Sequence, residues 1–182
     1  TVGVGVGKLG LKERPKDIPG RQAAATVGQC ELMALYDRMF SEYHNTVAQI
    51  LLTRSDIDIE KRKQHTKDTF NTLLEMGIIP IVNENDSVSV EELVFGDNDN
   101  LSAIVAALVE ADGLIILTDI DGYYDDNPRE NPDARLIHTL SDITDEMIVA
   151  AGGSGSDKGT GGMRTKLEAA KFAMNHGIET II

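Results

Sequence analysis

Short apolar runs alternate with longer segments of helical periodicity along this chain, and that alternation limits the folds open to it. The patterns predict helices at 22–44, 58–76, 101–111, 141–151 and 163–176, and strands at 47–53, 78–82, 90–95, 114–118 and 177–182. Strands separated by helices are typical of a parallel sheet. The sequence therefore predicts an α/β fold with an open, mainly parallel sheet and helices on both faces, an α/β/α sandwich.

Local signals refine this prediction. The run Leu-Ile-Ile-Leu-Thr at 114–118 is the most apolar, which favours a central strand buried on both faces. Pro80 suggests that its strand lies at an edge or ends there, and Pro19-Gly20 predicts a turn before the first long helix. The expected helix caps are polar residues near two helix starts, namely Asn100 or Asp99, and Ser141 or Asp142.

The composition is that of one globular domain. With 182 residues, of which 41% are hydrophobic, the chain can bury a core without metals or disulfides. Its one cysteine, Cys30, fits a reducing compartment. Cys30 lies within a predicted helix of apolar residues, and we expect its side chain in the hydrophobic core. No apolar run approaches the roughly 20 residues of a membrane span. We expect a single domain over residues 1–182 in a soluble, cytoplasmic protein without contact to a membrane.

The charge balance argues against nucleic acid as a partner. The formal net charge is −13, whereas phosphate contacts along nucleic acid need clustered lysine and arginine. The same acidity repels small anions. An anionic ligand would therefore need a site where glycine amides and lysines are concentrated locally.

The two ends of the sequence are unusual. Thr1 leads directly into Val-Gly alternation up to Gly7, which with Lys8 resembles a tight glycine-rich turn from strand to helix. This segment fits neither a Walker A motif nor a dinucleotide fingerprint. The last residues stop inside an apolar run. We expect from these features a chain truncated at both ends.

Three polar stretches lie where ligands bind in open α/β sheets, outside the carboxyl ends of strands. They are residues 83–86, residues 96–100 and the pair Thr118-Asp119. Each alone is more often a turn or a helix cap. Their recurrence at several strand ends favours a common binding site.

The residue types in these stretches suit an amino acid ligand. The side-chain amides of Asn83, Asn85 and Asn98 can hold a zwitterion without adding charge, because an amide both donates and accepts hydrogen bonds. Asp86 can pair with an α-ammonium group. Asp99 is better placed to organise neighbouring donors or to contact Mg²⁺ at a distance, next to a helix N-terminus that attracts anions.

A glycine-rich loop at 152–162 precedes the helix that carries Lys166. Glycine lets backbone amides approach phosphate oxygens, and the ammonium group of Lys166 can neutralise charge on a transferring phosphoryl group. The spacing is not that of a Walker A motif. A flexible surface loop remains the alternative interpretation.

Other candidate sites are weak. The histidines are scattered without metal-ligand spacing and are expected at the surface: His44, His65, His138 and His176. The aspartates between 119 and 126 mimic part of a calcium loop, but the glycine and the closing glutamate of such a loop are misplaced. No resident metal site is predicted.

Taken together, these motifs resemble the amino acid kinase family, and within it the bacterial enzymes that phosphorylate the side-chain carboxylate of free glutamate. The resemblance covers essentially the whole chain. It is carried by Ala-Thr-Val-Gly-Gln (25–29), Gln-Ile-Leu-Leu-Thr (49–53), Pro-Ile-Val-Asn-Glu-Asn-Asp (80–86), Gly-Asp-Asn-Asp-Asn-Leu-Ser-Ala (96–103), Leu-Thr-Asp (117–119) and Gly-Thr-Gly-Gly-Met (159–163) with Lys166.

The resemblance implies roles for these residues. Asp86 and Asn98 match glutamate-binding positions, Asn83 lines the same pocket, and Asp99 organises the catalytic groups. The positions that match nucleotide-binding segments are Thr118, Asp119, Thr160, Gly161, Gly162, Met163, Arg164, Thr165 and Lys166. Lys166 is in addition the lysine that contacts phosphate during catalysis.

The resemblance also implies a reaction and its partners. Glutamate and ATP would give glutamyl 5-phosphate and ADP with Mg²⁺, the first step of proline synthesis, and proline would inhibit near the glutamate site. Relatives form dimers or tetramers, so a homo-oligomer is expected. A lysine-bearing first strand and a Ser-Gly pair typical of the family would precede Thr1, and no RNA-binding-like C-terminal domain is present.

Two alternatives stay open from the sequence. One is a related kinase that acts on acetylglutamate, aspartate, carbamate or a nucleoside monophosphate. The other is a non-catalytic fragment that keeps part of a ligand pocket but cannot transfer phosphate.

Overall fold

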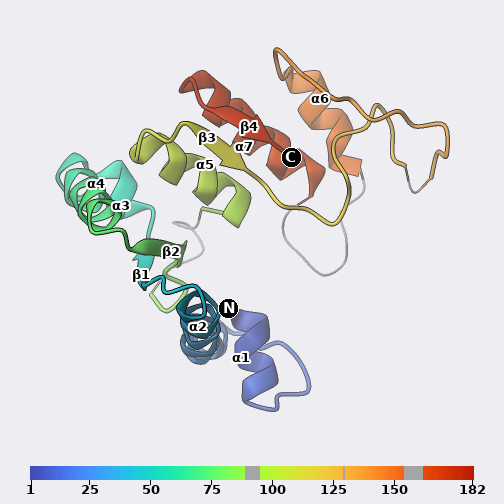
Figure 1. The fold of residues 1–182 in the computed structure, drawn as a ribbon. Coiled ribbons are helices and arrows are strands. Elements are labelled where there is room, and N and C mark those ends of the chain that lie inside the picture. The colour runs from blue at the N-terminus through green and yellow to red at the C-terminus, as the bar shows by residue number, and fades with distance from the viewer. Residues whose placement is uncertain (89–94, 129, 154–161) are drawn as a thin grey trace. The chain divides into compact units, whose positions relative to one another are not determined.

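The computed structural model describes residues 1–88, 95–128, 130–153 and 162–182. It divides into two compact units, Thr1–Val94 and Phe95–Ile182, which are described separately below. Both units contain helices and parallel strands in alternation, so the predicted α/β class is confirmed (Figure 1). The described strands form two separate two-stranded sheets. A single domain over the whole chain stays a prediction, and the strand predicted at 90–95 lies almost entirely outside the described residues.

The first unit carries a parallel pair of strands joined through helices. Its elements are α1 (Val2–Lys8), α2 (Ile18–Ser41), β1 (Val47–Leu52), α3 (Ser55–Asp58), α4 (Glu60–Glu75) and β2 (Ile79–Glu84). The strands β1 and β2 pair from Val47↔Ile79 to Leu52↔Glu84. Because the two strands run in the same direction, both carboxyl ends lie at one edge of this sheet.

The start of the chain is a helix, which corrects the prediction of a strand-to-helix turn there. Glycine and valine both have low helix propensity, so the Val-Gly repeat gave no helix signal. The helix is instead stabilised by packing against α2. A Cβ on Gly5 would overlap the backbone of Ala24, and a Cβ on Gly28 would overlap the carbonyl of Thr1. The backbones of α1 and α2 therefore touch, and only glycine fits at these two positions.

Helix α2 begins earlier than predicted. Asp17 is its N-cap, and the Asp17 carboxylate accepts a hydrogen bond of 2.8 Å from the backbone of Gly20. Pro19-Gly20 belongs to the first turn, where proline loses no helical hydrogen bond, and is not a turn before the helix. Cys30 on this helix is exposed, so its expected place in the core was wrong.

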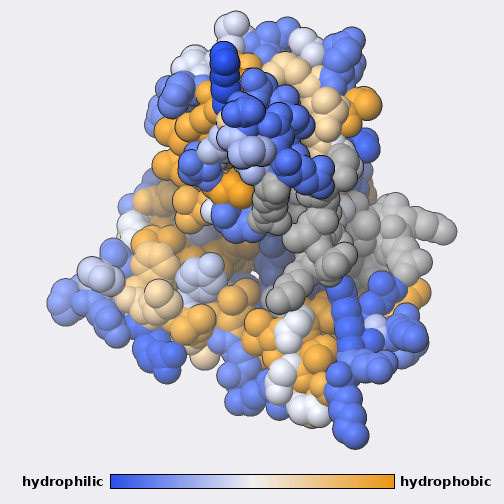
Figure 2. Space-filling view, turned by 90° about the vertical axis from the view of Figure 1, so that its right-hand side faces the viewer, coloured by the Kyte–Doolittle hydropathy of each residue, from blue (hydrophilic) through white to orange (hydrophobic). Residues whose placement is uncertain are grey.

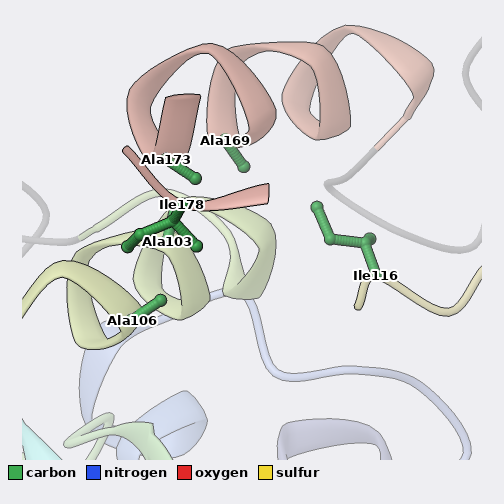
Figure 3. Packing of buried hydrophobic residues seen from close by; sticks show 6 residues of the cluster. All are labelled: Ala103, Ala106, Ile116, Ala169, Ala173 and Ile178. Atoms are coloured by element: carbon green, nitrogen blue, oxygen red, sulfur yellow. The ribbon is translucent and has the colours of Figure 1, made fainter. Parts of the chain in front are cut away.

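The second unit is built around small side chains. Its elements are α5 (Asn98–Leu108), β3 (Gly113–Ile115), α6 (Asp145–Ala150), the 3-10 turn η2 (Ala151–Gly153), α7 (Met163–Asn175) and β4 (Glu179–Ile181). The strands β3 and β4 are parallel, from Gly113↔Glu179 to Ile115↔Ile181. Alanines on α5 and α7 allow these helices to approach closely around Ile178 (Figure 3). The buried cluster comprises Ala103, Ala106, Ile116, Ala169, Ala173 and Ile178.

Three predictions for this unit need correction. The apolar run 114–118 is not a strand buried on both faces, since β3 ends at Ile115 and the side chain of Leu117 is 87% exposed. An apolar run cannot reveal how many partners a strand has, and β3 pairs only with β4 among the described residues. The two predicted helix caps were also wrong, because the N-caps are Asp97 for α5 and Thr144 for α6. Each of these side chains accepts a hydrogen bond from the backbone N–H of the residue three positions later.

The surface mixes polar and apolar residues. Figure 2 shows hydrophobic patches between hydrophilic ones on one face, and side chains such as Met39, Tyr43 and Met76 are more than half exposed. In the part of the chain that the structure describes, no helix is long and apolar enough to cross a membrane. The four histidines are exposed, as predicted.

Candidate functional site

The first unit contains a pocket at the carboxyl edge of the β1–β2 sheet, called the amide pocket below. Its volume is about 160 Å³. It is lined by Thr1, Ala25, Thr26, Gln29, Cys30, Gln49, Leu51, Glu84, Asn85, Asp86 and Ser87. The sequence predicted a ligand site after the second of these strands, and the pocket lies there.

Asp86 lies on the wall of the amide pocket in a fixed turn. The backbone N–H of Asn85 donates to the carbonyl of Leu52 at 2.8 Å, which continues the parallel ladder one step past β2. The Ser87 hydroxyl contacts the Asn85 side chain. The half-buried carboxylate of Asp86 accepts a hydrogen bond of 2.7 Å from the Thr1 hydroxyl through Oδ2. Among the described residues no donor bonds to its other oxygen, Oδ1, which can therefore meet a ligand cation.

Asn83 lies beneath the amide pocket and is not among the residues that line it. Its side chain is buried, and its Nδ2 donates to Gln29 Oε1 at 3.1 Å. Gln29 Nε2 in turn donates to Gln49 Oε1 at 3.0 Å. Asn83 thus contacts a residue that lines the amide pocket, and its expected role in glutamate binding stays a prediction.

Sequence reasoning assigned no role to Gln29 or Gln49. A polar signal was available for Gln49, because this glutamine interrupts the apolar run of β1. Gln29 sits in a helix with no such contrast, and only its burial at 8% exposure reveals that its amide needs partners.

The second unit holds a cluster around Asp99, called the Asp99 cluster below. Lys166 Nζ lies 3.0 Å and 3.2 Å from the two carboxylate oxygens of Asp99. The two side chains are only 14% and 16% exposed. The Thr165 hydroxyl lies 2.8 Å from Asp99 Oδ2 and can donate to it. An aspartate and a lysine 67 residues apart in sequence thus form a partly buried ion pair with a hydroxyl beside it.

Two helix starts meet at this cluster. Asp99 lies in the first turn of α5, which Asp97 caps through a 2.9 Å bond from Asn100 N–H. Thr165 and Lys166 lie in the first turn of α7, where the N–H of Gly162 donates to the Thr165 hydroxyl at 3.0 Å. Helix N-termini carry partial positive charge. Together with the Lys166 ammonium, they make this part of the unit favourable for an anion.

The remaining predicted site residues belong to the same unit, and the structure gives mainly their positions along the chain. Asn98 opens α5 and is exposed, and Thr118 and Asp119 follow β3 by a few residues. Met163 and Gly162 start α7. Arg164 points outward and pairs with Glu168 at 2.9 Å. Thr160 and Gly161 lie outside the described residues.

Comparison with known proteins gives these two clusters a context. A model of the amino acid kinase family matches residues 4–182 and so includes both units. The chain belongs to the amino acid kinase family. It is 56% identical to the glutamate 5-kinase of Clostridium perfringens, matching all of this chain and 69% of that protein. It is 55% identical to those of Clostridium acetobutylicum and Geobacillus kaustophilus, covering 68% and 49% of them.

The residue types in the two clusters differ in the ligands that they could bind. The amide pocket offers hydrogen-bonding amides and a carboxylate, which fit an amino acid zwitterion. The Asp99 cluster offers a held ammonium group and two helix N-termini, which fit phosphate. Among the described residues, no group of three His, Cys, Asp or Glu side chains could hold a metal ion.

Proposed function

We propose that the protein transfers the γ-phosphoryl group of ATP to the side-chain carboxylate of glutamate, giving glutamyl 5-phosphate and ADP, as the first step of proline biosynthesis. The observation that carries this proposal is the Asp99 cluster, in which Lys166 Nζ is held 3.0 Å from Asp99 at two helix starts. The glutamate 5-kinases similar to this chain support the choice of substrate.

The chemistry needs charge stabilisation more than proton transfer. The attacking group is a carboxylate with an ordinary pKa near 4, so it is ionised at neutral pH and requires no general base. A new C–O–P linkage forms while the bond between the γ-phosphorus and the β,γ-bridging oxygen breaks, and ADP leaves with that oxygen. Lys166 would neutralise negative charge on the transferring group, with Asp99 fixing its ammonium in place.

Substrate selection would fall to the amide pocket. Asp86 would pair with the α-ammonium of glutamate through the oxygen that Thr1 does not occupy. N-acetylglutamate has no ammonium to offer, and its neutral amide would leave the Asp86 carboxylate without a cation. Thr118, Asp119 and residues 160–166 would bind the nucleotide. This division places amino acid and nucleotide recognition largely on different units of the chain.

Magnesium would enter as part of the nucleotide substrate. Mg²⁺ in kinases is held mainly by phosphate oxygens and water, with one or two protein carboxylates. A cytoplasmic location, a homo-oligomeric state and inhibition by proline at the glutamate site belong to the same proposal.

The test is a product assay with the full-length protein, ATP and Mg²⁺. Glutamate, N-acetylglutamate and aspartate are compared by ADP release, and hydroxylamine is added to trap any acyl phosphate as its hydroxamate. Glutamate should give both ADP and hydroxamate, with kcat/KM at least about 100-fold above N-acetylglutamate, the discrimination expected when a site's charged group is left unpaired. Equal turnover of N-acetylglutamate, or ADP without hydroxamate, would reject the proposal.

A further inference from the structure

Three amide side chains form one line across three elements of the first unit. Asn83 at the end of β2 donates to Gln29 on α2, and Gln29 donates to Gln49 on β1, with N···O distances of 3.1 Å and 3.0 Å. Asn83 and Gln29 are both 8% exposed, whereas Gln49 is exposed and lines the amide pocket. The line therefore runs from the buried end of β2 to the pocket wall.

The direction of every amide in this line is fixed by one backbone group. The backbone N–H of Glu84 donates to the Asn83 side chain at 2.9 Å, and an N–H can only donate. The atom of Asn83 that meets it must therefore be the oxygen, so its nitrogen faces Gln29. That nitrogen requires an oxygen on Gln29, which turns the Gln29 nitrogen toward the oxygen of Gln49.

The last amide of the line consequently keeps its nitrogen available, on a side chain that lines the pocket. Gln49 Oε1 is occupied by Gln29, and in the described part of the chain no acceptor bonds to Gln49 Nε2. The pocket wall thus carries an N–H donor at Gln49 and a carboxylate at Asp86. A ligand that satisfies both groups needs an acceptor oxygen and a cationic donor close to each other.

We propose that Gln49 Nε2 donates to the α-carboxylate of the amino acid substrate, and that Asn83 is a positioning residue which sets this donor through Gln29. The proposal rests on the function proposed above, since glutamate carries its α-carboxylate on the same carbon as the ammonium that Asp86 would hold. Gln49 then binds the α-carboxylate, and the side-chain carboxylate stays available for phosphorylation. Asn83 acts without touching the ligand.

Cys30 supplies a readout that does not depend on turnover. This cysteine is exposed and lines the same pocket, so a bound ligand should slow its alkylation by iodoacetamide. The rate is followed by mass spectrometry on the peptide that contains Cys30, in the full-length protein, over a series of glutamate concentrations. The half-protecting concentration gives the dissociation constant for glutamate, and calorimetry with ADP gives the nucleotide affinity of each variant.

A double-mutant cycle then separates positioning from contact. Gln49→Ala should raise the glutamate dissociation constant about 10- to 100-fold, the range for a hydrogen bond to a charged group. Asn83→Ala should raise it about tenfold in the unsubstituted protein but less than about threefold in the Gln49→Ala background, because both act through one donor. ADP affinity should not change. Gln64→Ala, which removes an exposed amide bonded only to Asp68, is the control.

A second variant guards against misfolding of Asn83→Ala. Asn83→Asp keeps the acceptor for the Glu84 N–H but has no donor for Gln29. The Gln29 and Gln49 amides should both flip, so that an oxygen faces the pocket and glutamate binding weakens at least as much as in Gln49→Ala.

The outcomes distinguish this inference from the proposed function. Equal losses on substituting Asn83 with and without Gln49 would show that Asn83 contacts the ligand itself, which overturns the inference and leaves the proposed function standing. Failure of glutamate to slow alkylation of Cys30 in the unsubstituted protein would remove glutamate from the pocket and overturn both.

Discussion

Asp99 makes three contacts with two hydrogen-bonding groups, since both of its oxygens lie near Lys166 Nζ and one also lies near the Thr165 hydroxyl. A lysine side chain has several rotatable bonds, and holding it in one place costs conformational entropy. Here the surrounding α5 and α7 turns fix the carboxylate first. The ammonium is thereby placed before any substrate arrives, which is the requirement for electrostatic catalysis.

Replacement of Lys166 by methionine should lower kcat about 10²- to 10³-fold, the range for losing one positioned electrostatic group. The KM for glutamate should change little, because Lys166 is not among the residues that line the amide pocket. Steady-state kinetics with each substrate varied would measure both effects. Lys171→Met is the matched control, since Lys171 lies on the same helix and pairs with Asp145 at the surface. If the Lys166 variant kept more than about a third of the normal rate, the ion pair with Asp99 would contribute no more than an ordinary surface ion pair does, and Lys166 would have no catalytic role.

Replacement of Asp86 by asparagine should weaken glutamate binding and leave ATP binding unchanged. The amide oxygen can still accept from Thr1, so the turn after β2 keeps its shape while the charge is lost. An unpaired ammonium in the pocket would cost on the order of 2–5 kcal/mol. Isothermal calorimetry with glutamate and with ADP would test this, and an unchanged glutamate affinity would take Asp86 out of the site. Asp68→Asn, on the exposed face of α4, provides the charge-matched control.

At the scale of the elements, the contact between α1 and α2 predicts opposite effects on stability for two glycine-to-alanine substitutions, one at Gly28 in the contact and one at Gly3 outside it. Gly28→Ala places a Cβ against the Thr1 carbonyl and the Gly5 nitrogen, so α1 must move away from α2 at a cost of about 1–3 kcal/mol. Gly3→Ala meets nothing within 4 Å and should stabilise α1 by about 0.5–1 kcal/mol. Denaturant unfolding of both variants checks the signs. Destabilisation by both would show that the two helices are not packed this way.

The elements that the sequence predicted well are those with strong local signals. Gly77 and Gly177 end α4 and α7 in the left-handed region, with φ of 70° and 75°, as expected for glycine after a helix. Helix α1 and strand β3 were mispredicted because their structure depends on distant partners. No window of sequence around the Val-Gly repeat contains α2, and none around 114–118 contains β4.

The same distinction applies to the site. The polar stretches at 83–86 and 96–100 could be predicted from their place after apolar runs. The line of hydrogen bonds from Asn83 through Gln29 to Gln49 could not be predicted, because it depends on the β1–β2 register and on Gln29 of α2 contacting both strands. The binding and catalytic roles themselves stay predictions.

Across the whole molecule, the division into two units predicts that ligands protect different regions from hydrogen exchange. Glutamate should slow exchange in peptides around residues 25–30, 47–53 and 83–88 of the first unit. ADP with Mg²⁺ should slow exchange around 97–100, 118–119 and 162–168 in the second unit. Bound ligand stabilises the segments it orders, so each pattern should appear with that ligand alone. Protection of the first unit by ADP alone would contradict the assignment.

The pairing of β3 with β4 and the Asp99 cluster should both form late in folding. Both join segments that are far apart in the chain, since Thr165 lies 66 positions after Asp99 and Gly113 pairs with Glu179. Helices such as α5 and α7 can form from local contacts within microseconds, whereas closing so long a loop is slow. During refolding, the helices would therefore be present before their first turns meet. The Asp99 cluster would be assembled among the last features of the second unit.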